Sequence, residues 1–523
     1  MKLYKNAVFH SGLTEQDSFS FLLEDKGRIV GTYKARPEGK YQEVDLKGRH
    51  VYPCLIDGHT HMLLTVAVLA TGFNICEIGS DGVQPRSMAG IEKRLRAYAD
   101  KQPKGAVVAC NNYILTAIDE QRLPNRQELD DWGDGRPVVI YNIDGHSTAL
   151  STAMLRLAGL DENGSGVLTG EENERAQGRI MDVLSSAITL PKLARGIANF
   201  HNKCAEYGIC MVGALEGQGD SPKDSATALI LQLARRFDID VRAYLQYRDL
   251  NRVDRFRKYM AHPRVGGCGD WEMDGSNGSH SAAFSLPYKD SGEIAPCYYS
   301  QQDVDELCSA ADKAGYQIAS HAIGDVAINM LLHGLEGLES DTFHRIEHAE
   351  FMDDAAFEKI RKGRWALMMQ PGYSWIDKRY LHTYSRFLPD EIIANMRLKS
   401  LVDAGVCVCG SSDSPVQDMD PWLQMLGMVQ FYNEDESNTP YEAFCCYTKN
   451  AARAMLEEKN YGTLEKGKYA SFFCTEENIF TLSPEKLVAV RPGETYYKGR
   501  LYKKKKGSIA EFALMLLKKA KKI

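Results

Sequence analysis

Two histidines one residue apart follow an apolar run and have the spacing to bind a metal ion together. The run covers residues 51–56, and the sequence DGHTH at 57–61 comes directly after it. Because side chains alternate along a strand, His59 and His61 point to one side while Thr60 points to the other. Neutral imidazoles are good ligands for zinc, iron and manganese. A metal site is one interpretation of this pair, and two ordinary strand histidines are the alternative.

Three more candidate ligands follow predicted strands elsewhere in the chain. His321, His348 and Asp413 each come after a short apolar run. The carboxyl ends of barrel strands meet at one edge, so these side chains would face the same site as His59 and His61. Each has an ordinary alternative: a helix cap for His321, a buried core histidine for His348 and a turn residue for Asp413. Taken together, the five residues favour a metal site.

The elements that must position these residues alternate between strand and helix patterns. Between residues 57 and 450, apolar runs of strand length alternate with helical stretches such as 325–338. Such repeats predict an α/β fold, a (β/α)8 TIM-like barrel with insertions, whose chemistry lies at the carboxyl ends of the strands. The runs with the pattern of buried strands are 138–141, 209–215, 241–245, 317–319, 366–369 and 406–409.

Both ends of the chain carry short strand patterns instead. Residues 1–54 hold alternating runs broken by glycine, lysine and proline, and residues 461–502 return to the same texture. We expect the two ends to meet in one small β domain. The expected division is a composite β domain from 1–54 and 455–502, a barrel from 55–454 and a basic helix from 503–523.

The C-terminal segment differs from the rest of the chain in charge. Residues 503–523 hold eight lysines and one glutamate, a net charge of +7, which leaves −14 on the remainder. Ser508 and Glu511 have the spacing of a capping box, and apolar residues follow at helical intervals. The predicted amphipathic helix either docks on the protein's own body or a second subunit, or contacts a membrane surface.

Composition and charge restrict the class of protein. The 523-residue chain has a formal net charge of −7 and is 44% hydrophobic, which predicts a globular protein with a large core and argues against a nucleic-acid partner. Its thirteen cysteines show no paired framework, as in a reducing compartment. Residues 1–6 lack a signal-peptide pattern, and no window holds eighteen uninterrupted apolar residues. We therefore expect a cytoplasmic protein without an integral membrane segment.

Six short motifs occur in order along nearly the whole chain. They are DGHTH at 57–61, DGHS at 144–147, DGSNGS at 274–279, HAIGD at 321–325, RIEHA at 345–349 and GSSDSPV at 410–416. Together they resemble the amidohydrolase superfamily, specifically its family 3 branch and proteins of the N-substituted formamide deformylase type. Residues 447–452 and 462–470 resemble the family's last barrel helix and its return to the small β-sandwich.

The resemblance implies a metal-dependent hydrolase of C–N bonds, with a barrel and a β-sandwich made from both chain ends. His59 and His61 match the ligands of the first strand, His321 and His348 those of the fifth and sixth, and Asp413 the aspartate of the eighth. The expected cofactor is a divalent transition metal, Zn²⁺ first, which acidifies water and polarises a carbonyl. Asp413 would move the proton, and His348 would either bind a second metal or hydrogen-bond the substrate oxygen.

One departure from the family pattern concerns the number of ions. A lysine that can bridge two ions is common on the fourth strand shortly before DGS, but residues 268–275 contain none. Asp270, Glu272 and Glu216 are the candidate replacements for this bridge. The simpler expectation is a single ion, with two ions as the alternative. The ligands of the single ion would be His59, His61, His321 and Asp413.

Four residues are candidate substrate contacts. They are His146 in DGHS, His280 where the family often has arginine, and the aromatic pair Tyr373 and Trp375 after a predicted strand. The alternative for the aromatic pair is ordinary packing. The predicted activity is hydrolysis of an amide-type, non-peptide C–N bond in a small molecule. Deamination of a ring substrate and a catalytically silent binding or structural barrel are the alternatives, and a homo-oligomer stays an open expectation.

The His-x-His pair generates a prediction about metal content. Purified protein should carry a divalent transition metal, because His59 and His61 present two imidazoles on one side of a strand. The double variant His59→Ala, His61→Ala should lose both the metal and turnover while circular dichroism still shows a folded barrel. Elemental analysis measures the metal. Turnover by a metal-free preparation would contradict this interpretation.

Overall fold

A parallel sheet of eight strands forms the centre of the molecule. The computed structural model describes residues 1–71, 73–79, 82–217 and 224–523. The central sheet runs in the order β19-β18-β17-β16-β15-β14-β13-β6. Its strands are β6 (Leu55–Thr60), β13 (Ile209–Glu216), β14 (Asp240–Leu245), β15 (Arg264–Glu272), β16 (Gln317–Ala322), β17 (His344–His348), β18 (Trp365–Met369) and β19 (Cys407–Gly410).

Contacts between the first and last strands nearly close this sheet into a barrel. The backbone N–H of Asp413 donates to the carbonyl of His59 at 2.9 Å. Asp57 adds a side-chain link by accepting hydrogen bonds from the backbone and the hydroxyl of Ser412, at 3.0 and 2.6 Å. The predicted α/β barrel is therefore confirmed, and two residues of the predicted site take part in its closure.

Helices connect the strands and pack around the barrel. Two of them show why they begin where they do: α9 starts with a capping box between Ser300 and Asp303, and α17 with one between Thr439 and Glu442. The helices between barrel strands and after β19 are α1 (Met62–Thr71), α6 (Leu190–Tyr207), α7 (Ser225–Ala234), α8 (Leu250–Arg257), α9 (Gln301–Lys313), α10 (Asp325–Glu336), α11 (Asp354–Lys362), α12 (Pro371–Ile376), η2 (Asp377–Leu381), α13 (Thr383–Phe387), α14 (Asp390–Ala394), α15 (Lys399–Asp403), α16 (Pro421–Val429), η3 (Glu434–Glu436), α17 (Pro440–Tyr447) and α18 (Lys449–Ala454).

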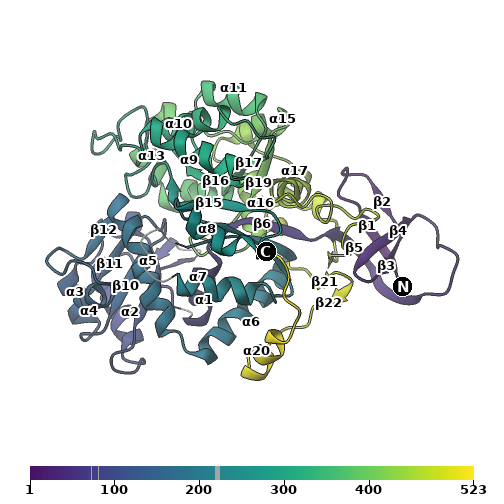
Figure 1. Cartoon of the computed structure of the whole chain (residues 1–523), viewed down its shortest axis with the longest axis horizontal. Helices are drawn as coiled ribbons and strands as arrows, with labels where there is room; N and C mark the ends of the chain where they lie inside the picture. The colour runs from purple at the N-terminus through teal and green to yellow at the C-terminus, as the bar shows by residue number, and fades with distance from the viewer. Residues whose placement is uncertain (72, 80–81, 218–223) are drawn as a thin grey trace.

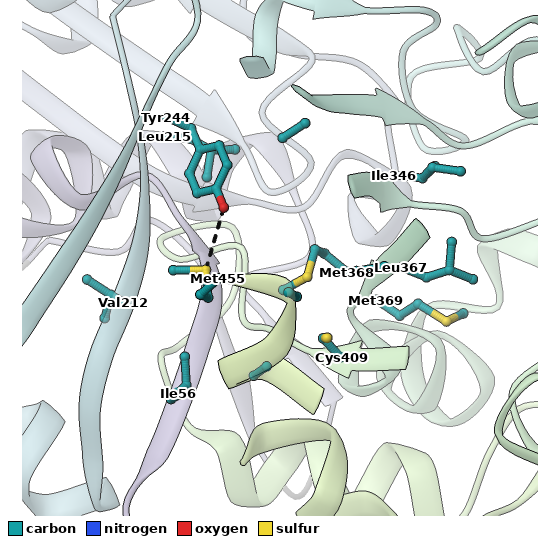
Figure 2. Close-up of a cluster of buried hydrophobic side chains, with 14 of the residues drawn as sticks. Ile56, Val212, Leu215, Tyr244, Ile346, Leu367, Met368, Met369, Cys409 and Met455 are labelled. Carbon is teal, nitrogen blue, oxygen red and sulfur yellow. Dashed lines mark hydrogen bonds between the residues drawn. The ribbon is translucent and has the colours of Figure 1, made fainter. Parts of the chain in front are cut away.

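The interior of the barrel is filled by apolar side chains from several strands. Every residue of β13 and β14 is buried, because these strands are covered on both faces, and this explains the apolar run in each. Figure 2 shows Val212, Leu215 and Met368 within this core. The Tyr244 hydroxyl lies 3.8 Å from the sulfur of Met455. A packed interior leaves the carboxyl ends of the strands as the place for a site.

A second sheet is inserted between β6 and β13, at the lower left of Figure 1. Its strand order is β12-β11-β10-β9, and the run 138–141, predicted as one of the barrel's strands, is part of its β10. The prediction was wrong because Val138 and Ile140 enter one apolar core while Val139 and Tyr141 enter another, so β10 is buried on both faces like a barrel strand. The insertion comprises β7 (Glu77–Gly79), β8 (Gly82–Gln84), α2 (Met88–Ala99), β9 (Val108–Tyr113), η1 (Leu115–Ala117), α3 (Arg126–Trp132), β10 (Val138–Asn142), β11 (Ser147–Leu150), α4 (Thr152–Ala158), β12 (Val167–Thr169) and α5 (Gly170–Ala187).

The two ends of the chain meet in one sheet, where purple and yellow strands approach each other in Figure 1. Its order is β22-β21-β20-β5-β1-β3-β4, with β2 on β1, and Phe472 pairs with Pro53 across the junction. A sandwich of two facing sheets is not confirmed, since these strands form one hydrogen-bonded sheet, and the domain boundaries stay a prediction. The elements are β1 (Lys2–His10), β2 (Ser18–Phe19), β3 (Phe21–Asp25), β4 (Arg28–Tyr33), β5 (Gln42–Pro53), β20 (Phe472–Thr475), η4 (Ile479–Thr481), α19 (Pro484–Val488), β21 (Glu494–Tyr497) and β22 (Arg500–Leu501).

The basic C-terminal segment contains a short helix, α20 (Ile509–Leu516), that lies against the protein's own body. It begins with a capping box between Ser508 and Glu511. The side chain of Arg236 donates to the carbonyl of Leu516 at 3.2 Å. Within the described part of the chain, no helix is both long enough and apolar enough to cross a bilayer.

Close approach of β6 and β13 generates a stability prediction. A Cβ atom added to Gly213 would lie 2.0 Å from the carbonyl oxygen of Gly58, a backbone atom that cannot rotate away. Gly213→Ala should therefore lower the free energy of unfolding by about 1–3 kcal/mol, the usual cost of overpacking. Gly164→Ala is the matched control, because its Cβ would meet nothing within 4 Å. Urea unfolding that shows equal stability for the two variants would contradict the prediction.

Candidate metal centre and cavity

The carboxyl ends of the barrel strands bring together the five predicted ligands. His59 is the penultimate residue of β6 and His61 follows that strand, His321 lies on β16, His348 ends β17, and Asp413 follows β19. The Oδ1 atom of Asp413 lies 3.1 Å from Nε2 of His59 and 3.2 Å from Nε2 of His61. That oxygen is buried, yet no described group donates it a hydrogen bond of ordinary geometry. Ring nitrogens and a carboxylate oxygen aimed at one another in this way fit a metal ion.

A chain of buried charges holds His59 in place. Nδ1 of His59 lies 2.6 Å from Glu347, and Arg345 donates to both oxygens of Glu347 at 2.8 and 2.7 Å. A carboxylate behind a ligating histidine fixes the ring orientation and leaves Nε2 for the metal. Burial acts against the ionisation of Glu347, but Arg345 and His59 lower its pKa to about 2. Glu347 is therefore a full negative charge that positions His59.

Cys268 is a site residue that the sequence analysis missed. Its sulfur lies 3.7 Å from Nε2 of His59 and 4.0 Å from both Nδ1 of His321 and Nε2 of His348. Two sets of candidate donors share it: one contains His59 and His61, and the other contains His321 and His348. The sequence signal for Cys268 was its position at the start of the fourth-strand stretch 268–275, close to Asp270 and Glu272. Cys268 lies where an anionic ligand shared by two ions would lie.

Burial sets the protonation states that metal binding requires. Burial lowers the pKa of His348 to about 4 and that of His321 well below its usual value, and nearby histidines act in the same direction. Both rings are then neutral, the form in which imidazole binds metals. Burial opposes the ionisation of Asp413, but His59 and His61 hold its pKa well below the usual range. His321 and His348 are therefore neutral nitrogen donors and Asp413 is an ionised carboxylate, whereas Asp413 and Glu347 overcome the effect of burial on His59 and raise its pKa to about 9.

The three candidate bridging carboxylates do not join the five ligands. Asp270 accepts a hydrogen bond from the backbone of Arg248 at 3.0 Å and is part of none of the donor sets among the described residues. Glu216 accepts one from the backbone of Leu63 at 3.0 Å, and burial raises its pKa to about 8. Glu272 lies in a separate donor set with His146. Cys268, unlike these three carboxylates, lies within 4.0 Å of ring nitrogens of His59, His321 and His348.

A cavity of about 740 Å³ opens beside the centre. His348 and Asp413 line it, and so do His146 and Tyr373, two of the four predicted substrate contacts. The remaining lining is largely apolar and includes Ile323, Met369, Met396, Val416 and Phe431. The cavity also contains Glu350, Asn277 and Tyr384, for which the sequence offered no signal.

His280 and Trp375, the other two predicted substrate contacts, are not among the residues that line this cavity. Nε2 of His280 lies 2.9 Å from a carboxylate oxygen of Asp290, and its ring packs on Phe387. The indole N–H of Trp375 donates to Gln430 at 3.0 Å. Both side chains are thus engaged outside the cavity.

The buried chain behind His59 generates a prediction for Glu347→Gln. The variant leaves the fully buried guanidinium of Arg345 without its counter-charge, which should cost about 3–5 kcal/mol of stability. Loss of the carboxylate behind His59 should also weaken metal binding by roughly 10–100-fold. Glu336→Gln is the control, because Glu336 pairs with Lys359 at the surface. Thermal unfolding and metal titration measure both effects; equal behaviour of the two variants would refute the role of Glu347.

Comparison with known proteins assigns the chain to a family. The model of the amidohydrolase family matches residues 42–502. YtcJ of Bacillus subtilis is 22% identical over 533 aligned residues, which cover 95% of this chain and 99% of that protein. The N-substituted formamide deformylase of Arthrobacter pascens is 25% identical and covers 92% of this chain and 94% of that protein.

A solved structure shares the fold. A metal-dependent hydrolase from Pyrococcus horikoshii aligns with a TM-score of 0.71 at 21% identity, covering 92% of this chain and 99% of that one. The family match spans most of the chain and includes every strand of the barrel and all five predicted ligands. This protein therefore belongs to the amidohydrolase family.

Proposed function

We propose that this protein hydrolyses an amide-type, non-peptide C–N bond in a small molecule, with a divalent transition metal and with Asp413 as the proton shuttle. The observation that carries the proposal is the position of Asp413. Its Oδ1 lies within 3.2 Å of the ring nitrogens of His59 and His61, and the residue also lines the cavity. One carboxylate thus borders both the metal ligands and the space for a substrate.

The chain's own residues divide the chemistry between them. When bound, a divalent metal acidifies water and polarises a carbonyl group. Asp413, ionised at neutral pH, accepts the proton of that water and passes it to the leaving nitrogen. His348 is oriented by Gln370, whose side-chain oxygen lies 2.8 Å from Nδ1, so its Nε2 faces the centre.

The types of the candidate ligands support zinc. Whether one or two ions bind depends on whether Cys268 can act as a ligand shared by both. Imidazole nitrogen and cysteine sulfur are the donors that Zn²⁺ prefers. The single-ion expectation followed from the absent lysine, because two close cations need a shared anion. A thiolate at Cys268, within 4.0 Å of three of the histidines, supplies such an anion. A single ion would be held by His59, His61, His321 and Asp413. If two ions bind, His59, His61 and Asp413 would hold one and His321 and His348 the other, and Cys268 would have to lose its proton to serve both, although burial raises the pKa of its thiol well above the usual range.

The cavity supports a small amide as substrate. Its surface is largely apolar with a few polar groups, among them Asn277 and Gln370, as is usual for small-molecule sites. The Arthrobacter pascens relative is named for N-substituted formamides, which are small amides. Tyr373 and the surrounding apolar side chains suit an apolar substituent on the nitrogen.

Asp413→Asn tests the proposal together with a substrate panel. Wild-type protein should turn over one or more N-formyl or N-acyl compounds, lose activity after chelation and regain it with Zn²⁺. Asp413→Asn should lower turnover by roughly 10²-fold or more, because it removes the acid/base group. Asp403→Asn, an exposed carboxylate on α15, is the control. Turnover restricted to amino-heterocycles would assign a deaminase instead, and near-wild-type turnover by Asp413→Asn would rule out the shuttle.

A further inference from the structure

A second set of candidate donors lies beside the metal centre. It consists of His146, Glu174 and Glu272, whose donor atoms all lie within 4.8 Å of one another. Nδ1 of His146 lies 3.1 Å from an oxygen of Glu174. The ring of His146 meets that of His321 edge-on, with centroids 5.3 Å apart. The set is therefore a neighbour of the proposed centre and shares none of its ligands.

The three side chains come from elements in different parts of the fold. Each side chain accepts or makes a hydrogen bond that holds it in place. His146 lies in the turn between β10 and β11 of the inserted sheet, Glu174 lies in the first turns of α5, and Glu272 ends barrel strand β15. The amide of Asn173 donates to the carbonyl of Gly145 and to Glu174, both at 3.0 Å. The set is thus built before any ligand arrives, which lowers the entropic cost of binding.

The set holds two carboxylates and one histidine. Glu272 is only 3% exposed, and one of its oxygens accepts from the backbone of Gly269 at 2.8 Å. Its other oxygen has no hydrogen-bond partner among the described residues. No described lysine or arginine forms an ion pair with Glu174 or Glu272; His146 is the partner of Glu174. A buried and a partly buried carboxylate this close together favour a positive charge or a shared proton beside them, and His146 offers at most one positive charge.

We propose that His146, Glu174 and Glu272 bind a divalent cation of their own, separate from the ions at the His59 centre. One imidazole and two carboxylates are a donor set for zinc or manganese, and three protein donors leave coordination positions for water. The ion would join the inserted sheet, α5 and β15, and would place positive charge behind the cavity wall that His146 forms. This inference goes beyond the proposed function and holds whichever bond the enzyme cleaves.

Metal counting in matched variants tests the inference, with Zn²⁺ alone as the probe. After loading and removal of excess metal, the double variant Glu174→Gln, Glu272→Gln should hold about one equivalent less zinc than wild type. Asp270→Asn is the control, because Asp270 is two residues from Glu272 but outside the donor set. The variant His59→Ala, His61→Ala should retain the zinc at His146, so loss of the main centre and loss of this site are distinguishable.

Anomalous scattering at the zinc edge from wild-type crystals locates the ion directly and does not depend on any variant folding. A peak between His146, Glu174 and Glu272 supports the inference. A map without a peak there, or zinc content in the folded double variant equal to that of wild type, overturns it and assigns a shared proton to the two carboxylates.

Discussion

The imidazole of His59 is held between two carboxylates, and the candidate site depends on that arrangement. Nδ1 lies 2.6 Å from Glu347 and Nε2 lies 3.1 Å from Asp413. Arg345 neutralises Glu347 from the far side. In a buried environment each unpaired charge would cost several kcal/mol, so every member of this chain keeps its neighbour in position. The backbone of Asp413 also bonds to His59 and helps to close the barrel. The same contacts between His59 and Asp413 therefore help to close the barrel and align the candidate ligands.

The inserted sheet completes the site from outside the barrel. Asp144 accepts hydrogen bonds from the hydroxyls of Ser276 and Ser279 at 2.9 and 2.6 Å, which joins the DGHS and DGSNGS motifs. His146, two residues later, then faces the cavity next to His321. The barrel therefore supplies the five proposed metal ligands, and the insertion supplies Asp144 and His146 to the wall of the cavity. The insertion also packs on the elements around the barrel: α5 contacts α1 and α7, and Ile376 and Leu381 join one of its apolar cores.

The sequence was sufficient for the barrel and for its five candidate ligands. Side-chain alternation placed His59 and His61 on one side of a strand, and strand ends placed His321, His348 and Asp413 at a common edge. Such patterns are local, but in a parallel barrel the carboxyl ends of all strands lie at one edge, so residues at strand ends are brought close together by the fold itself. The run 138–141 shows the limit of this reasoning. A strand buried on both faces has the same apolar sequence whether it belongs to a barrel or to an insertion between two cores.

The tertiary structure decided the partners of the ligands. A buried cysteine such as Cys268 and a buried glutamate such as Glu347 look like ordinary core and strand residues in sequence, because their roles come from segments far away along the chain. His280 and Trp375 show the converse: contacts with Asp290 and Gln430 engage them outside the cavity, although their sequence neighbours suggested substrate contacts. Residue type and period determined which groups were available for chemistry. Which of them meet was decided by loop conformation and long-range packing, which no local pattern encodes.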